Sequence, residues 1–244
     1  LPTLMHCTAS IDRIEEIEKL PLESSDEQHF LRGTAGVSVE NLSFRYSDGV
    51  DDIFTNFSFD FVPGSKTSIV GPTGRGKSTL IKLMLSLLSP TKGSVSIYSA
   101  DEKVRASEST RCNLVYVPQG NTLFSGTIRE NLQMGDPHAT DSQMKEALYT
   151  AAADFVMELP SGLDTQCFEA GGGLSEGQAQ RIAIARALLR PGSILLLDEF
   201  SSALDNATED LLLQRLTAKL NTRTMIFIPH RGRVIDYCDS VLRL

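Results

Sequence analysis

Hydrophobic and polar residues alternate in two stretches near the start of the chain, and this pattern predicts two half-exposed β-strands. The stretches are VSVENLSFRY, from Val37, and FTNFSFDFV, from Phe54. Shorter apolar segments in KTSIVG, GSVSIY and NLVYVPQ predict three further strands. The continuous apolar runs of SILLLDE and TMIFI indicate strands buried on both faces of a parallel sheet.

Helical periodicity appears between these strands. We expect a helix over residues 77–88, directly after KTSIVG, and another within residues 139–159. An Ala/Ile/Leu-rich helix follows the sequence LSEGQ, and a further helix precedes TMIFI. The apolar positions that indicate the second and fourth helices are Met144, Leu148, Ala151 and Phe155, and Leu212, Leu216 and Leu220. Strands that alternate with helices in this way predict an α/β fold.

The segment that precedes the first strand has a different character. ASIDRIEEIEKL predicts a short charged helix with Ile11, Ile14 and Ile17 on or near one face, and residues 21–36 form a polar, acidic linker. The sequence has no initiator Met and no signal peptide. We therefore expect a fragment of a longer protein, with residues 1–36 as a helix and linker.

Composition narrows the classes of function. The 244 residues fit one large α/β domain or a domain with a subdomain, and 41% hydrophobic residues are enough for a core. A net charge of -8 without a Lys/Arg block argues against nucleic acid as a partner. No apolar run approaches the 18 residues of a membrane span. Four scattered cysteines argue against a disulfide or zinc framework: Cys7, Cys112, Cys167 and Cys238.

The sequence GPTGRGKST matches the phosphate-binding pattern GxxxxGK[ST], and it lies between a predicted strand and a predicted helix. In such a loop the backbone N–H groups surround phosphate oxygens and the helix N-terminus adds its positive dipole. Lys77 then reaches the β- and γ-phosphates, and the Ser78 hydroxyl binds Mg²⁺. The alternative is a glycine-rich turn that only caps a helix. The predicted nucleotide-binding residues are Gly71, Pro72, Thr73, Gly74, Arg75, Gly76, Lys77, Ser78 and Thr79.

An acidic pair ends the buried strand of SILLLDE. Asp198 is the expected second protein ligand of Mg²⁺, because ligands bind at the carboxyl ends of strands in open α/β sheets. Glu199 follows directly and is the expected base that orients and deprotonates a water. The alternative is that Asp198 and Glu199 are an ordinary helix N-cap and a first-turn acid. Because the chain also has a phosphate-binding loop, we favour the catalytic interpretation.

A second glycine-rich stretch, AGGGLSEGQ, also begins a helix. Ser175 and Gln178 fit a capping box, and Glu176 falls at the first helical position, where an acid favours the helix dipole. The same charge should repel a phosphate that arrives at this N-terminus.

Together these motifs resemble the nucleotide-binding domain of ATP-binding cassette transporters. The resemblance runs from about Val37 to the end, through FRYSDG, GPTGRGKST, VPQ, LSEGQ, ILLLDEFSSALD and PHR in this order. It implies a P-loop NTPase core with a mainly parallel sheet, an antiparallel β subdomain and a helical subdomain inserted at about residues 125–190. The cassette would then span residues 37–244.

The resemblance implies roles for single residues of one ATP site. Tyr46 looks like the aromatic residue that stacks on adenine, and Gln119 like the residue that touches Mg²⁺ or the attacking water. His230 resembles the histidine that contacts the γ-phosphate. From the residues alone, Tyr46 could cover a strand end, Gln119 could end a strand, and His230 could be structural.

Other residues resemble groups that act between domains. Ser175, Gly177 and Gln178 would hold the ATP of a second, head-to-tail cassette, so that ATP joins the two. Asp205 looks like the residue that contacts this partner, although it could simply cap the next helix. Glu169, in CFEAGGG, is similar to an acid that faces the membrane part.

LFSGTIRENL and ASIDRIEEIEKL resemble segments of exporters whose membrane helices are fused to the cassette. The chain is thus expected to hydrolyse Mg-ATP at the cytoplasmic face of a membrane and to work with a transmembrane domain. A DNA-repair ATPase is excluded, because such proteins split the cassette with a long coiled coil and no heptads separate GPTGRGKST from LSEGQ here. A soluble cassette protein of another kind, such as a translation factor, and a non-hydrolysing regulatory cassette are the alternatives. The sequence departs from the common family pattern at Arg75, Phe168, Glu176, Ala179 and Pro229.

Overall fold

The computed structural model describes residues 11, 13–15, 18–19, 23, 27–47, 49, 51–120, 122–168, 173–229 and 232–244. The strands are β1 (Gly36–Phe44), β2 (Phe54–Phe61), β3 (Lys66–Val70), β4 (Lys92–Tyr98), β5 (Lys103–Arg105), β6 (Leu114–Val117), β7 (Gly126–Thr127), β8 (Gln166–Cys167), β9 (Ile194–Asp198), β10 (Thr224–Ile228) and β11 (Ser240–Arg243). The α-helices are α2 (Lys77–Met84), α3 (Ile128–Gln133), α4 (Asp141–Thr150), α5 (Glu176–Leu188) and α6 (Asn206–Lys219). The 3-10 helices among these residues are η1 (Ser109–Asn113), η2 (Asp154–Glu158), η3 (Gly162–Asp164) and η5 (Gly232–Tyr237).

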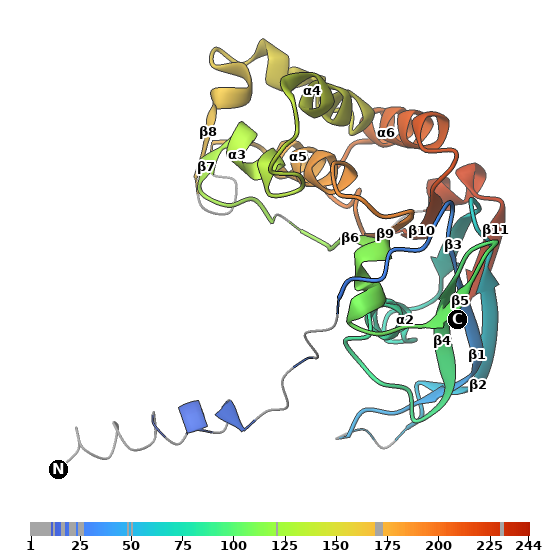
Figure 1. Ribbon diagram of the computed structural model, residues 1–244. Coiled ribbons are helices and arrows are strands. Elements are labelled where there is room, and N and C mark those ends of the chain that lie inside the picture. The colour runs from blue at the N-terminus through green and yellow to red at the C-terminus, as the bar shows by residue number, and fades with distance from the viewer. Residues whose placement is uncertain are drawn as a thin grey trace.

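Two main sheets organise the chain. A sheet in the order β11-β3-β10-β9-β6 is parallel throughout, and a sheet in the order β2-β1-β4-β5 is antiparallel. The short strands β7 and β8 pair separately, beside the helices (Figure 1). All five residues of β9 and of β10 are buried, as their continuous apolar runs predict. The expected α/β fold with a mainly parallel sheet and an antiparallel sheet is confirmed.

Helices cover the parallel sheet on both faces. Helix α2 lies between the parallel and the antiparallel sheet, whereas α3, α4, α5 and α6 gather on the opposite face (Figure 1). The segment between β6 and β9 supplies α3, α4 and α5, which is where a helical insertion is expected from the sequence. The two glycine-rich helix starts therefore lie on opposite sides of the parallel sheet.

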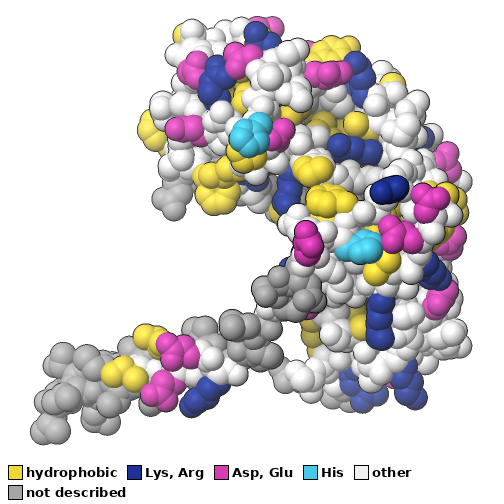
Figure 2. Space-filling model, viewed as in Figure 1, with side chains coloured by type: hydrophobic (Ala, Val, Ile, Leu, Met, Phe, Trp, Pro, Cys, Tyr) yellow, Lys and Arg dark blue, Asp and Glu magenta, His cyan; other side chains and the backbone are white. Residues whose placement is uncertain are grey.

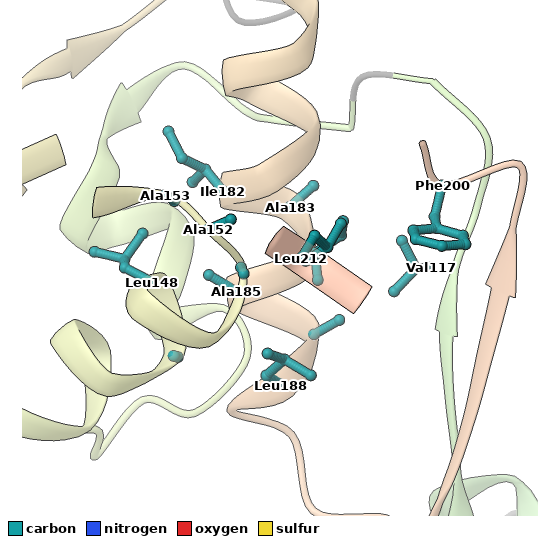
Figure 3. Close-up of a cluster of buried hydrophobic side chains, with 14 of the residues drawn as sticks. Val117, Leu148, Ala152, Ala153, Ile182, Ala183, Ala185, Leu188, Phe200 and Leu212 are labelled. Atoms are coloured by element: carbon teal, nitrogen blue, oxygen red, sulfur yellow. The ribbon is translucent and has the colours of Figure 1, made fainter. Parts of the chain in front are cut away.

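Each face of the parallel sheet has its own hydrophobic core. Along β9, Leu195 and Leu197 join the core under the helices, whereas Ile194 and Leu196 join the core beneath the antiparallel sheet. This follows from the alternation of side chains along a strand. Figure 3 shows part of the first core, where Ile182 and Ala185 of α5 pack near Leu148 of α4.

Two predicted helices end earlier than expected, and the same local structure ends both. Helix α2 stops at Met84 because Ser86 adopts a left-handed conformation with φ 55°, and the N–H groups of Ser86 and Leu87 bond back to Leu83 and Lys82. Helix α4 stops at Thr150 in the same way, with Ala152 at φ 53°. Both ends are Schellman motifs without the usual glycine.

The N-terminal segment is helical at residues 11, 13–15 and 18, in agreement with the predicted charged helix. Ile11 and Ile14 are more than half exposed there, and the predicted Ile17 lies outside the described residues. No helix in the described part of the chain is long and apolar enough to span a membrane. On the face shown in Figure 2, Lys and Arg side chains are scattered among Asp and Glu, so this face has no single basic patch.

Candidate nucleotide site

The loop between β3 and α2 turns sharply into the helix at Gly76. Gly76 has φ 89°, and a Cβ atom there would lie 2.6 Å from Ile53 Cγ2 and 2.9 Å from Phe54 Cζ. Only glycine fits both the conformation and the space. No acidic residue occupies the first turn of α2, so the partial positive charge of its N-terminus is not offset there.

Lys77 crosses this loop with its side chain. Its ammonium group donates hydrogen bonds to the carbonyl oxygens of Gly71, at 2.7 Å, and Pro72, at 3.0 Å. Residues 71–75 are exposed, including the unusual Arg75. The loop is therefore an exposed stretch of backbone at the start of α2, with Arg75 exposed and the Lys77 ammonium group beside it, an arrangement suited to a polyphosphate.

Asp198 lies at the carboxyl end of β9 with 6% of its surface exposed. Burial raises the pKa of its carboxyl group, while hydrogen bonds from Tyr116 and Ser78 act in the opposite direction. The Tyr116 hydroxyl donates to Asp198 Oδ2 at 3.2 Å, and burial together with the charge of Asp198 raises the pKa of Tyr116 to about 12. A cation beside this buried carboxyl group would stabilise its charged form.

The residues at this point fit a Mg²⁺ ion. A carboxylate and a hydroxyl of the phosphate-binding loop meet here, and both are oxygen ligands, which Mg²⁺ prefers. In the described part of the chain, no group of three or more His, Cys, Asp or Glu residues could hold a metal.

Glu199 is held in an unusual backbone conformation. Its φ is 46°, in the left-handed region, which a residue with a side chain rarely adopts. Its N–H donates to the carbonyl of Ile228 at 2.9 Å, and its carboxylate accepts a 2.6 Å hydrogen bond from the Gln119 amide. Backbone strain of this kind is concentrated at functional sites. The side chains of Gln119 and Glu199 are thus in contact.

Tyr46 lies beside the start of α2, with 38% of its surface exposed. Its hydroxyl forms a 3.1 Å hydrogen bond with Thr79 Oγ1, and its ring packs edge-on against Phe44 at 5.0 Å. Tyr46 also lines a cavity of about 530 Å³ with Arg45, Asp52 and other residues. An exposed aromatic ring next to the phosphate-binding helix can stack on a base.

The helix start at LSEGQ has the predicted capping box. Ser175 Oγ accepts from the Gln178 N–H at 3.2 Å, and Gln178 Oε1 accepts from the Ser175 N–H at 2.9 Å. Glu176 is exposed in the first turn. A Cβ atom on Gly177 would lie 2.7 Å from the carbonyl oxygen of Ala203, so glycine permits a close approach to the loop after Glu199.

Asp205 caps the next helix. One of its carboxylate oxygens accepts from the N–H groups of Ala207 and Thr208, both at 3.0 Å, and the other accepts from the Thr208 hydroxyl. These bonds lower the pKa of Asp205. The capping role that the sequence left open for Asp205 is thus present. His230 and Glu169, predicted to contact the γ-phosphate and the membrane part, lie outside the described residues.

Three residues that contact this site are not evident from the sequence motifs. They are Tyr116, which bonds Asp198, Gln180, which bonds the Glu199 carbonyl, and Arg186, which bonds Thr122 near Gln119. Tyr116 could have been found from strand pairing, because β6 and β9 are parallel neighbours and Tyr116 is opposite Leu196. The contacts of Gln180 and Arg186 depend on how α5 packs on the sheet.

Comparison with known proteins adds a consistent set of relatives. A family model described as ABC transporter matches residues 54–202. The mycobactin import ATP-binding/permease protein IrtB of Mycolicibacterium thermoresistibile is 37% identical over 242 residues, which cover 99% of this chain and 42% of that protein. The ABC multidrug transporter mdr2 of Aspergillus fumigatus is 40% identical over 91% of this chain and 30% of its own length.

A solved structure agrees in fold. A bacterial Atm1-family ABC exporter with ATP bound matches with a TM-score of 0.84 and 32% identity, over 100% of this chain and 43% of that chain. The chain thus spans less than half the length of these relatives.

Proposed function

Because the chain belongs to the ABC transporter family, in which it is a nucleotide-binding domain, we propose that it hydrolyses Mg-ATP to power transport across a membrane. The observation that carries the proposal is the pairing of Gln119 with Glu199 at the end of β9, next to Asp198. A strained acid, a buried acid and a phosphate-binding loop support hydrolysis rather than binding alone.

We assign the chemistry as follows. Residues 71–79 surround the phosphates, and Lys77 leaves the carbonyls of its own loop for phosphate oxygens. Glu199 accepts a proton from the attacking water, and the Gln119 amide orients the Glu199 carboxylate. Ser78 and Asp198 hold Mg²⁺, which neutralises developing phosphate charge when bound. His230 contacts the γ-phosphate in this proposal.

We assign Tyr46 to the ATP of its own chain and the remaining residues to contacts with a second cassette. Tyr46 stacks on adenine, while Ser175, Gly177 and Gln178 contact the ATP on a partner cassette and Asp205 lies at that interface. The positions of α2 and α5 on opposite sides of the parallel sheet support this, because one chain does not bring both helix starts to one ATP. ATP then favours the closed dimer because its contacts with LSEGQ exist only there.

The membrane partner is a transmembrane domain, joined to residues 1–36, and the cassette of residues 37–244 acts at the cytoplasmic face of the membrane. Glu169 faces this partner. The permease relatives and the exporter with a similar cassette support the assignment. A relative named for import and a solved exporter share this kind of cassette, so the membrane part sets the direction of transport.

Glu199→Gln tests the proposal. Gln keeps the size of the side chain but cannot accept a proton, so we expect ATP turnover to fall by about 100-fold or more while ATP binding remains. The variant should also accumulate as an ATP-bound dimer. Glu158→Gln, an exposed change on η2, is the matched control. Turnover by Glu199→Gln at the wild-type rate would contradict the role of Glu199 as the base. A wild-type chain that binds ATP without hydrolysing it would contradict the proposed ATPase activity.

A further inference from the structure

Helix α5 carries two polar side chains that bond outside the helix, one to Glu199 and the other to Thr122, three residues after Gln119. Gln180 is 1% exposed, and its amide donates to the main-chain carbonyl of Glu199 at 3.3 Å. Arg186, one and a half turns further, donates to the carbonyl of Thr122 at 2.9 Å and to the Thr122 hydroxyl at 2.6 Å. One rigid helix thus contacts the main chain of Glu199 and the segment that follows Gln119.

These contacts and the Gln119–Glu199 hydrogen bond meet at Glu199. Glu199 accepts from Gln180 of α5 and from Gln119, while Arg186 of the same helix bonds Thr122, three residues after Gln119. Arg186 also lies over the Phe124 ring at 5.6 Å, which fixes the same segment a second time. A rotation of α5 would therefore shift Thr122 relative to the main chain of Glu199.

The backbone of Glu199 requires such support. A left-handed conformation is unfavourable for glutamate, and it persists only where its surroundings hold it. The Ile228 carbonyl holds the N–H of Glu199, while the N–H of Ser202 and the amide of Gln180 hold its carbonyl. Without Gln180, one of the two groups that hold the carbonyl is lost.

We propose that Gln180 and Arg186 are positioning residues, and that α5 sets the register between Gln119 and Glu199. The inference rests on the proposed hydrolysis and adds a connection to it. Helix α5 begins at LSEGQ. There, Gly177 lies close to Ala203, in the loop that follows Glu199. A ligand at the start of α5 therefore acts on the Glu199 of the same chain, which belongs to the other ATP site of a head-to-tail dimer.

Gln180→Leu in the full chain tests this role. Leu has a similar volume, lacks the donor, and removes an amide oxygen that has no partner among the described residues. We expect kcat per titrated ATP-binding site to fall roughly tenfold, the scale of one lost hydrogen bond, with the Kd for ATP within about twofold of the wild type. Gln214→Leu, the same change at an exposed position of α6, is the matched control.

A second measurement does not depend on turnover. Hydrogen–deuterium exchange should increase in residues 199–205 of Gln180→Leu, and Arg186→Ala should increase it both in residues 118–124 and in residues 199–205. Arg186→Lys should recover part of the protection, because an ammonium group can still donate to the Thr122 carbonyl.

The outcomes separate the two proposals. A wild-type chain without turnover whose exchange responds as described overturns the hydrolysis and retains the positioning role. An active wild type with unchanged exchange and kcat in Gln180→Leu overturns the positioning role. Two further outcomes would assign Gln180 to stability alone and overturn the positioning role. One is an equal loss of kcat in the control Gln214→Leu. The other is a loss of folded, ATP-binding protein in Gln180→Leu that accounts for its whole loss of activity.

Discussion

The side-chain amide of Gln119 donates a 2.6 Å hydrogen bond to the carboxylate of Glu199, 80 positions further along the chain. The contact arises because β6 and β9 are parallel neighbours, so the residues that follow them meet at one edge of the sheet. β10, the other neighbour of β9, contributes the Ile228 carbonyl that holds the N–H of Glu199. Three strand ends thus define the geometry of one acid.

Tyr116→Phe should lower the stability of the chain in a pH-dependent way. Burial, together with the charge and the hydrogen bond of Asp198, raises the pKa of Tyr116 to about 12 in the folded chain, from about 10 when unfolded. The neutral hydroxyl and its bond to Asp198 therefore stabilise the fold fully below pH 10. This contribution is lost as the pH rises toward 12. We expect a difference in unfolding free energy of about 1 kcal/mol at neutral pH.

Urea unfolding of both proteins between pH 7 and pH 11 measures this difference. It should be constant to about pH 9 and shrink above pH 10. A difference that grows with pH in that range would contradict the assigned hydrogen bond.

Glu176→Gln should have opposite effects on the monomer and on the dimer. An exposed acid in the first turn of α5 favours the helix dipole, so its loss should lower monomer stability by about 0.3–1 kcal/mol. The same charge repels a phosphate at this N-terminus, so ATP-dependent dimerisation should become two- to fivefold tighter, roughly the same energy. Analytical ultracentrifugation in the Glu199→Gln background measures the dimer. An unchanged dimer affinity would contradict the proposed repulsion between Glu176 and the phosphate. Glu158→Gln removes the same charge at an exposed position of η2 and is the control.

Ser201→Ala should strongly lower the free energy of unfolding, although Ser201 has no assigned role in ATP binding or hydrolysis. The Ser201 hydroxyl donates at 2.5 Å to Glu209, whose side chain is fully buried, and the other Glu209 oxygen has no partner among the described residues. Without this donor a buried carboxylate has no hydrogen bond, at a cost of about 2–3 kcal/mol. Adding Glu209→Gln should restore part of the stability. Ser202→Ala, next to it, is the control in urea unfolding.

Ser86→Gly should stabilise the chain. Ser86 is at φ 55° in the motif that ends α2, where glycine has no steric penalty, and its hydroxyl makes only a 3.4 Å contact with the Ala106 carbonyl. We expect a gain of about 0.5–1 kcal/mol after the greater entropy of unfolded glycine is included. Thermal unfolding measures it, and Ser86→Ala should give no such gain.

The sequence motifs predict the order of the main strands and helices because each rests on local periodicity and turn chemistry. The capping box of Ser175 and Gln178 is an example, since both partners lie within one turn. The predicted helix ends at residues 88 and 159 are wrong because Ser86 and Ala152 adopt a conformation that glycine normally signals. The edge strand β11 has no such local signal, because its pairing with β3 depends on distant residues.

The residues of the candidate site also fall into those that local sequence predicts and those that it does not. Residues within the phosphate-binding loop can be assigned from spacing, because the loop itself creates the site. Gln180 and Arg186 cannot, because their partners are Glu199 and Thr122, which only the packing of α5 against the sheet brings near. A helix of small apolar residues predicts burial but not the direction of its few polar side chains.

The strand order also has a consequence for how the chain is made. β3, which leads into the phosphate-binding loop, pairs with β10 on one side and with β11 on the other, and both come from the last part of the chain. The antiparallel sheet, in contrast, uses only residues 36–105 and can assemble before β10 and β11 are synthesised. On the ribosome, therefore, the phosphate-binding loop is translated well before its neighbouring strands, and β3 gains both neighbours only after residues 224–243 have emerged.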